Sequence, residues 1–360
     1  MNLIEFGKKI FGNLICYKKL YLYGIIKINK MKYSILFLIP IIIFFESCKI
    51  GTNETLKDER INQNLKTEIE KLDKEILKAV STNDTELLKT IMSEQLIEES
   101  KGNLNQIIEH AGEIITSSEY QILNQFYVKN STEGINNTIQ SFDGKLNDYI
   151  IQYKALNKDI FVSLLIPKGE SSEDFVITNI YGKYSEGWKL NIIQFGRYKV
   201  EGETAPELYM RAKDEYSKGN LIDAANIIYV SSQIAKPSGV YWTYKLENER
   251  KDFEEKIIKE ANEKYSFPLT IQEVETKPQI LTIYPKATEE GFFPMIEYLT
   301  KIDLKDTIAT KSENDQIHNI IGKTFKGIDK NKKYIFYRAF SEISETKPIS
   351  SYGFVKTIEE

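Results

Sequence analysis

The chain has 360 residues, of which 41% are hydrophobic, 12% aromatic and 28% charged. This balance is typical of a folded globular protein and excludes a largely disordered chain. The formal net charge is −4, which argues against nucleic acid as a partner, because such binding depends on neutralising phosphates with basic residues.

An apolar run near the N-terminus has the layout of an export signal. Lys32 precedes an uninterrupted apolar stretch over 35–45, and Ser47 and Cys48 follow closely. A secretory signal needs a positive start, an apolar region of about 7–15 residues and a small residue at the cleavage site. A membrane-spanning helix needs about 20 apolar residues, and Glu46 ends this run earlier. We therefore predict a cleaved signal rather than a permanent membrane span.

The sequence Phe45-Glu46-Ser47-Cys48 resembles the lipobox of bacterial lipoproteins, in particular the Bacteroidetes type with Ser before the cysteine. Phe45 and Glu46 depart from the usual pattern. The resemblance implies cleavage before Cys48, lipidation of Cys48 and a lipid-anchored place in the bacterial cell envelope. Lys49 differs from the aspartate that retains enteric lipoproteins in the inner membrane, which favours the outer membrane. The alternative is an ordinary signal peptide or short anchor with a chance cysteine.

Met31 stands where such a signal would begin. We therefore predict that translation starts there and that residues 1–30 are not part of the protein; an extended positive region is the alternative. Residues 1–47 carry seven Lys and two Glu, so the mature chain has a net charge near −9. They also contain Cys16, which leaves Cys48 as the single cysteine of the mature chain. We expect no disulfide and no thiol nucleophile.

The mature chain begins with a predicted tether and a helical region. Residues 48–57 are short and polar, and we expect them to link the lipid to the folded body. Apolar residues then recur every three to four positions, which predicts amphipathic helices over 58–80, from 85 onward and over 104–115.

Strand signals follow, and together they predict an α+β domain over 58–200. Segments rich in β-branched and aromatic residues lie at 120–128, 148–156, 160–166, 175–184 and 188–198. Helices followed by a meander predict N-terminal helices on a curved antiparallel sheet. This order resembles the nuclear-transport-factor-2-like (cystatin-like) superfamily, mainly in the stretches AVSTNDTELLKTIMSEQL and YGKYSEGWKLNIIQF. That superfamily contains isomerases, dehydratases and noncatalytic binding modules, so the resemblance leaves the activity open.

Residues 201–265 predict a helical connector. The stretch LYMRAKDEYSKGNLIDAANIIYVSSQIAKP resembles one tetratricopeptide-type helical hairpin, and a long charged helix is predicted over 241–265. A stable solenoid needs about three such repeats, so we expect a hairpin packed between two domains. A peptide-binding adaptor is a further interpretation, and it predicts an exposed groove on the hairpin.

Residues 266–360 predict a second, smaller α+β domain. Its predicted strands lie at 269–274, 279–284 and 302–310, its helix starts at Ser312, and the segments 333–343 and 350–358 form a closing pair.

The residue pattern offers little catalytic chemistry, and we predict no catalytic residue, no cofactor and no metal ligand. Nucleotide-binding and serine-hydrolase motifs are absent from the sequence. The only histidines, His110 and His318, have no partner signal and are predicted to be ordinary helix residues.

Aromatic side chains on the predicted strands are the most suggestive feature of the first domain. Four of them are candidates to line an apolar pocket, although core packing is the favoured explanation; they are Tyr153, Phe161, Tyr181 and Trp188. We therefore predict an envelope lipoprotein that is a noncatalytic ligand-binding or protein-interaction module for an unknown protein or a small apolar ligand. The alternative is an enzyme of the nuclear-transport-factor-2-like type, which would show a desolvated carboxylate beside a tyrosine in a deep pocket.

Overall fold

Three mostly antiparallel sheets and eight α-helices make up the part of the chain that the computed structural model describes, which confirms the predicted α+β class. The described residues are 51–115, 119–168, 173–343 and 350–358. The predicted signal segment and Cys48 lie outside them. None of the helices within these ranges has the length and apolar character needed to cross a membrane.

The first sheet, called sheet A here, is buried on both faces. Its strands, in spatial order, are β1 (Thr52–Lys57), β2 (Tyr120–Asn130), β5 (Asp159–Pro167), β6 (Glu173–Tyr184) and β7 (Gly187–Val200). Every neighbouring pair is antiparallel. Successive side chains of a strand point to opposite faces, so a strand buried on both sides is apolar throughout. This explains the run IFVSLLI within β5.

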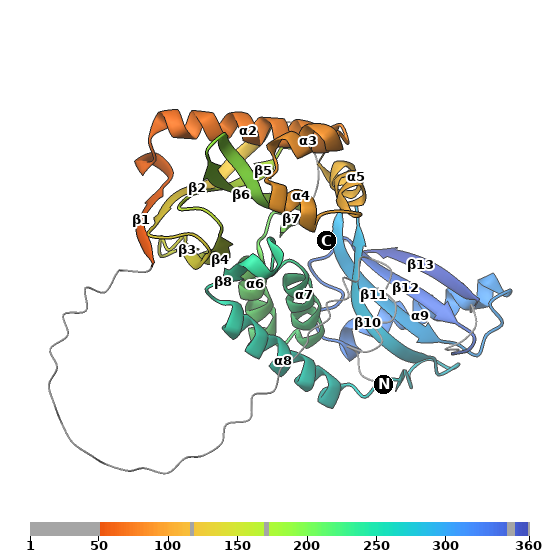
Figure 1. The fold of residues 1–360 in the computed structure, drawn as a ribbon. Helices are drawn as coiled ribbons and strands as arrows, with labels where there is room; N and C mark the ends of the chain where they lie inside the picture. Colours follow the sequence, from red (N-terminus) through yellow and green to blue (C-terminus); the bar gives the residue numbers. More distant parts are fainter. Residues whose placement is uncertain (1–50, 116–118, 169–172, 344–349, 359–360) are drawn as a thin grey trace, which may run out of the picture. The chain divides into compact units, whose positions relative to one another are not determined.

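Four helices cover one face of sheet A (Figure 1). They are α2 (Gln63–Ser81), α3 (Thr85–Ile91), α4 (Glu94–Glu99) and α5 (Leu104–Ile114). Asn62 and Asp84 cap α2 and α3 by accepting hydrogen bonds from backbone N–H groups of the first turn. The helices predicted here are confirmed, with α2 starting five residues later than expected. The short helix α4 was not predicted, because its six residues are too few to show a period.

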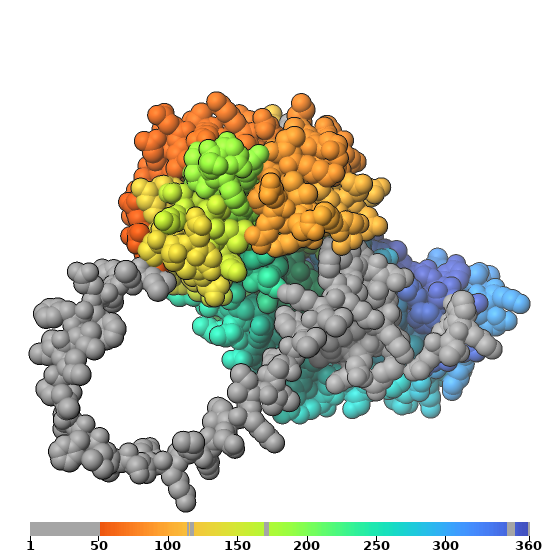
Figure 2. All heavy atoms as spheres, viewed as in Figure 1, coloured from red at the N-terminus to blue at the C-terminus, as the bar shows by residue number. Residues whose placement is uncertain are grey.

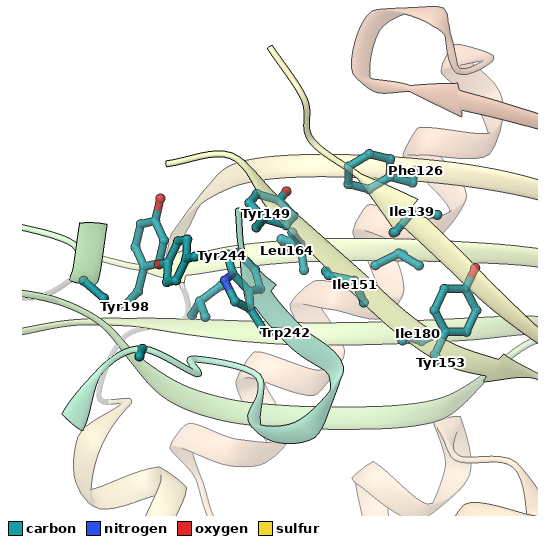
Figure 3. Close-up of a cluster of buried hydrophobic side chains, with 14 of the residues drawn as sticks. Phe126, Ile139, Tyr149, Ile151, Tyr153, Leu164, Ile180, Tyr198, Trp242 and Tyr244 are labelled. Atoms are coloured by element: carbon teal, nitrogen blue, oxygen red, sulfur yellow. The ribbon is translucent and has the colours of Figure 1, made fainter. Parts of the chain in front are cut away.

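A small three-stranded sheet, sheet B, covers the other face of sheet A. It consists of β3 (Ile135–Gln140), β4 (Tyr149–Ala155) and β8 (Trp242–Tyr244). Trp242 is fully buried, and its ring stacks on Tyr149 at a centroid distance of 3.9 Å. Figure 3 shows Trp242 among Tyr149, Tyr198 and Tyr244. The connector thus supplies a strand to this sheet, where the sequence had predicted helix.

The predicted helical connector is present as α6 (Ala205–Ser217), α7 (Leu221–Gln233) and α8 (Glu247–Lys264). Thr204 and Glu207 form a reciprocal capping box at the start of α6. α7 contributes to two cores: Val230 packs with sheets A and B, whereas Ile222 packs with the C-terminal sheet. The connector is therefore part of both cores, and the residues from 51 onward group as one compact unit.

The C-terminal sheet, sheet C, has the order β13-β12-β11-β10-β9. These strands are β9 (Leu269–Thr270), β10 (Gln279–Thr288), β11 (Gly291–Leu299), β12 (Tyr334–Phe340) and β13 (Ser351–Thr357). β11 and β12 are parallel, and α9 (Thr307–Thr324) connects them, as a parallel pair requires. The predicted closing pair is confirmed, because β12 and β13 are antiparallel neighbours.

Two predicted C-terminal elements are wrong. Residues 302–310 do not form a strand, and the helix does not start at Ser312. Asp306 accepts a hydrogen bond from the Ala309 backbone N–H at 2.9 Å, so α9 begins at Thr307 and Ser312 lies inside it. A helix cap outweighed the β propensity of a short Ile- and Thr-containing stretch.

The tether predicted over 48–57 is wrong in its described second half. Thr52–Lys57 forms β1 and pairs with β2 along its length. The strand looks like a tether in the sequence because it is an edge strand, and most of its residues are exposed.

Trp242→Ala should lower the free energy of unfolding by about 3–5 kcal/mol, because it removes the largest side chain of the core that joins β8 to sheets A and B. Val240→Ala, at a neighbouring exposed position, should change it by less than about 0.5 kcal/mol. Urea denaturation of the two variants measures both effects. Equal effects would contradict the assignment of Trp242 to the core.

Candidate functional site

A completely buried carboxylate, Asp73 of α2, is the most unusual polar group in the described chain. Its Oδ1 accepts hydrogen bonds from Asn179 Nδ2 at 2.9 Å and from the Tyr181 hydroxyl at 2.6 Å, and its Oδ2 accepts one from Ser163 Oγ at 2.7 Å. Ser163 comes from β5, and Asn179 and Tyr181 come from β6. The three donors point from the helix-facing side of sheet A.

Burial raises the pKa of Asp73 from its ordinary 3.8 to about 6, because the charged form loses its hydration. The hydrogen bonds from Tyr181, Ser163 and Asn179 act in the opposite direction, since they stabilise the carboxylate. Burial raises the pKa of Tyr181, and the neighbouring Asp73 raises it further. The cluster therefore has the chemistry that the enzyme hypothesis requires, a desolvated carboxylate beside a tyrosine.

The surroundings of Asp73 fit a structural role better than a catalytic one. The side chain has no exposed surface, and the helix-facing core around it is formed by apolar residues of α2, α3, α5 and sheet A. Both carboxylate oxygens are already engaged by protein donors. A catalytic carboxylate must reach substrate or a bound water, so this cluster instead joins α2 to two central strands.

The four aromatic residues predicted to line a pocket do not come together. Tyr153 lies in the core between sheets A and B (Figure 3), where its hydroxyl is 3.3 Å from Asn137 Nδ2. Phe161, Tyr181 and Trp188 lie on the opposite, helix-facing side of sheet A. The rings of Phe161 and Trp188 meet edge to face at 6.3 Å. All four are buried core residues, as the favoured sequence interpretation expected.

The two histidines occupy unrelated places. His110 is exposed on α5, with Nδ1 3.4 Å from Glu113 Oε2. His318 lies on α9, with Nδ1 2.9 Å from the Tyr337 hydroxyl. Burial lowers the pKa of His318, so its ring is mainly neutral at pH 7. Neither histidine lies beside Asp73 in the hydrogen-bond cluster.

A surface hollow of about 720 Å³ lies where the helical hairpin meets α8. Its walls combine aromatic, apolar and acidic side chains with one lysine; they are Tyr216, Ser217, Gly219, Leu221, Glu260, Glu263 and Lys264. The Tyr216 hydroxyl donates to Glu260 Oε2 at 2.9 Å, which fixes the aromatic wall against α8. Gly219 has φ of +80° in the tight turn between α6 and α7, a conformation that favours glycine.

Charges of both signs adjoin this hollow. α6 ends at Ser217 and α8 ends at Lys264, so two helix C-termini with partial negative charge adjoin it, whereas α7 begins at Leu221 and brings a helix N-terminus with partial positive charge. Glu260 and Glu263 add two carboxylates. Lys256 lies 4.6 Å over the ring of Tyr216, so the chain's own cation already occupies one face of that ring.

A second, smaller hollow of about 490 Å³ opens on sheet C, between the ends of β10 and β13. Tyr334, Phe336 and Val355 form its apolar wall, and Glu290 forms hydrogen bonds with Tyr334 and Lys333 at its edge. Neither of these two hollows is lined by Asp73, and neither contains a predicted pocket residue.

Sequence reasoning missed Asp73, although a signal was present. Asp73 stands four residues after Ile69 and four before Leu77, on the buried face of α2. Ser163 and Asn179 are likewise polar residues inside apolar strands. Three isolated polar residues at core positions predict a buried cluster, but only the fold shows that they meet.

Comparison of the chain with models of protein families, with curated proteins and with solved structures finds no match.

Asp73→Asn should flatten the pH dependence of stability. The folded state holds the Asp73 proton up to about pH 6 and the unfolded state only to about 3.8. Ionisation therefore weakens the fold as the pH rises through this window, by up to about 3 kcal/mol between pH 4 and pH 8. Asn does not titrate, so the stability of the wild type relative to the variant should fall by about that amount, as measured by urea denaturation at both values.

Tyr181→Phe is the companion variant. It removes a donor that lowers the pKa of Asp73, so the loss of stability should extend to higher pH than in the wild type. Parallel pH profiles for wild type, Asp73→Asn and Tyr181→Phe would show that this cluster does not titrate in the folded protein.

Proposed function

We propose that this protein is a lipid-anchored lipoprotein of the bacterial cell envelope, held in the membrane, with the outer membrane favoured, through Cys48. The support is the signal-like segment over 31–48 with its lipobox-like end. The placement of β1 adds to it, because a folded strand begins four residues after Cys48, where the mature chain would start.

The folded body acts as a noncatalytic binding module in this proposal. The observation that carries it is the state of Asp73: the carboxyl group with the chemistry of an acid–base residue is sealed in a packed core and fully hydrogen-bonded. Catalysis needs such a group within reach of the substrate. Surface hollows, in contrast, are open to ligands, and the larger one lies on the helical hairpin.

The ligand class that fits the hairpin hollow is a peptide segment with an apolar residue beside a Lys or Arg. Leu221 and Tyr216 offer apolar and aromatic contact, and Glu260 and Glu263 offer two carboxylates against the single ammonium group of Lys264 in the lining. Two helix C-termini add negative potential, which the N-terminus of α7 partly offsets. In such a site, buried apolar and aromatic contacts would supply most of the binding energy, and the carboxylates would select a basic residue beside them. The partner is then a basic, exposed segment of another envelope protein.

Cys48→Ala should leave the apolar segment over 35–45 uncleaved, because cleavage before position 48 and attachment of the lipid both depend on the cysteine of a lipobox. Radiolabelled palmitate should enter the wild type and not the variant. Ser47→Ala, beside the cysteine, should leave both properties unchanged. Palmitate labelling that survives Cys48→Ala would contradict the proposed anchor.

Glu263→Lys should weaken the binding of basic-apolar peptides at least tenfold, because it reverses an exposed charge at the hollow. Glu255→Lys, the same change at an exposed position of α8 outside the hollow, is the matched control and should have little effect. Screening a peptide array with residues 51–360, followed by titration of the selected peptides by calorimetry, measures both. Equal loss in the two variants would point to unspecific attraction by an acidic protein.

A further inference from the structure

The first strand of the folded body is fixed along its whole length. β1 pairs with β2 from Thr52 to Lys57. Just before it, the Gly51 carbonyl accepts the backbone N–H of Ser131 at 3.0 Å, and the Gly51 N–H donates to Ser131 Oγ at 2.9 Å. At the other end, Lys57 Nζ binds Asp143 at 2.7 Å. The backbone is therefore held in the folded body from Gly51 onward.

The distance between the predicted lipid and this strand is therefore short. Four Cα–Cα steps separate Cys48 from Thr52, and an extended chain spans at most about 3.6 Å per residue, or about 14 Å in all. A flexible linker of 20 residues, by comparison, reaches about 25 Å on average. With Cys48 at the bilayer surface, the start of β1 lies at most about 14 Å from the point of lipid attachment.

The start of β1 lies at one end of sheet A, and hydrogen bonds among the neighbouring turns show which end this is. Ser131 belongs to the turn after β2, and the Asn130 N–H donates to the Lys158 carbonyl at 2.8 Å in the loop before β5. Asn157 of the same loop donates to the carbonyl of Lys183 near the end of β6 at 3.3 Å. Figures 1 and 2 show β1 at the edge of the described body, beside the yellow region of β2–β4.

The opposite end of sheet A leads to the rest of the body. Because the strands alternate in direction, β5 ends there with Pro167 and β7 ends there with Val200, directly before the connector. Lys158 and Lys168 flank β5 at its two ends and are both exposed. At about 3.3 Å per residue, they lie about 30 Å apart.

We propose that the protein stands on the lipid bilayer with this end of sheet A, the turns at 131–134, 156–158 and 185–186, facing the headgroups. The proposal rests on lipidation of Cys48 as proposed above. The anchored end of β1 sets the contact point, and the net charge near −9 of the mature chain keeps the flanks of the body off an anionic surface. The connector, which carries the larger hollow, leaves the sheet at the end away from the bilayer and is presented to other envelope proteins.

The test compares one substitution at the two ends of one strand. Lys158→Cys and Lys168→Cys are made in the full chain, whose mature form has no other unmodified cysteine, and each is labelled with a small fluorophore. The lipidated proteins are reconstituted in phosphatidylcholine vesicles containing nitroxide-headgroup lipid. Quenching should be at least threefold stronger at position 158 than at position 168. A 20-residue Gly/Ser insertion before Gly51 should reduce the quenching at 158 severalfold.

Equal quenching at the two positions, or stronger quenching at 168, would show that the body lies flat or inverted and would overturn the orientation. Quenching at 158 that the insertion leaves unchanged would also overturn it, because the body would then adhere by its own surface. Failure of the lipoprotein assignment is seen separately and earlier: the unlabelled wild type would not float with the vesicles.

Discussion

Covering both faces of sheet A is the constraint on which the rest of the structure depends. Its central strands are mostly apolar on both faces, so neither face can meet water without a large loss of hydrophobic free energy. Helices α2 to α5 cover one face, and sheet B with the helical hairpin covers the other. Because β8 of sheet B comes from the connector, the N-terminal half completes its core only with residues that follow position 200.

The Asp73 cluster is the polar counterpart of this arrangement. A lone carboxylate in an apolar core is costly, and the donors of Ser163, Asn179 and Tyr181 offset that cost. They meet the carboxylate only in one register of α2 over β5 and β6, so the cluster specifies how the helix layer sits on the sheet. The Asp73 carboxyl group resembles an active-site acid, but its contacts are better explained by a role in setting the register of α2 on sheet A than by catalysis. A functional site is therefore expected on the surface.

Anchoring and binding, as proposed above, involve separate parts of the body. The strand nearest the predicted lipid is locked into sheet A, whereas the larger hollow is built from the hairpin and α8. Under the proposed anchoring, a short link to the membrane would limit the orientations available to the body. The proposed interaction site on the connector would gain from this, because a restricted orientation raises its effective concentration toward partners in the same membrane.

The sequence by itself determined the α+β class, most helix and strand positions, and the signal-like segment ending at Cys48, because these depend on local periodicity and composition. It did not reveal that Thr52–Lys57 is a strand or that Trp242 belongs to sheet B, since both elements are stabilised by partners distant in the chain. The separation of Tyr153 from Phe161, Tyr181 and Trp188 onto two faces, and the meeting of Asp73 with its three donors, were decided only by the tertiary structure. Residues from three elements must be brought together for the Asp73 cluster, and those from four elements for the aromatic set, and no local pattern encodes either encounter.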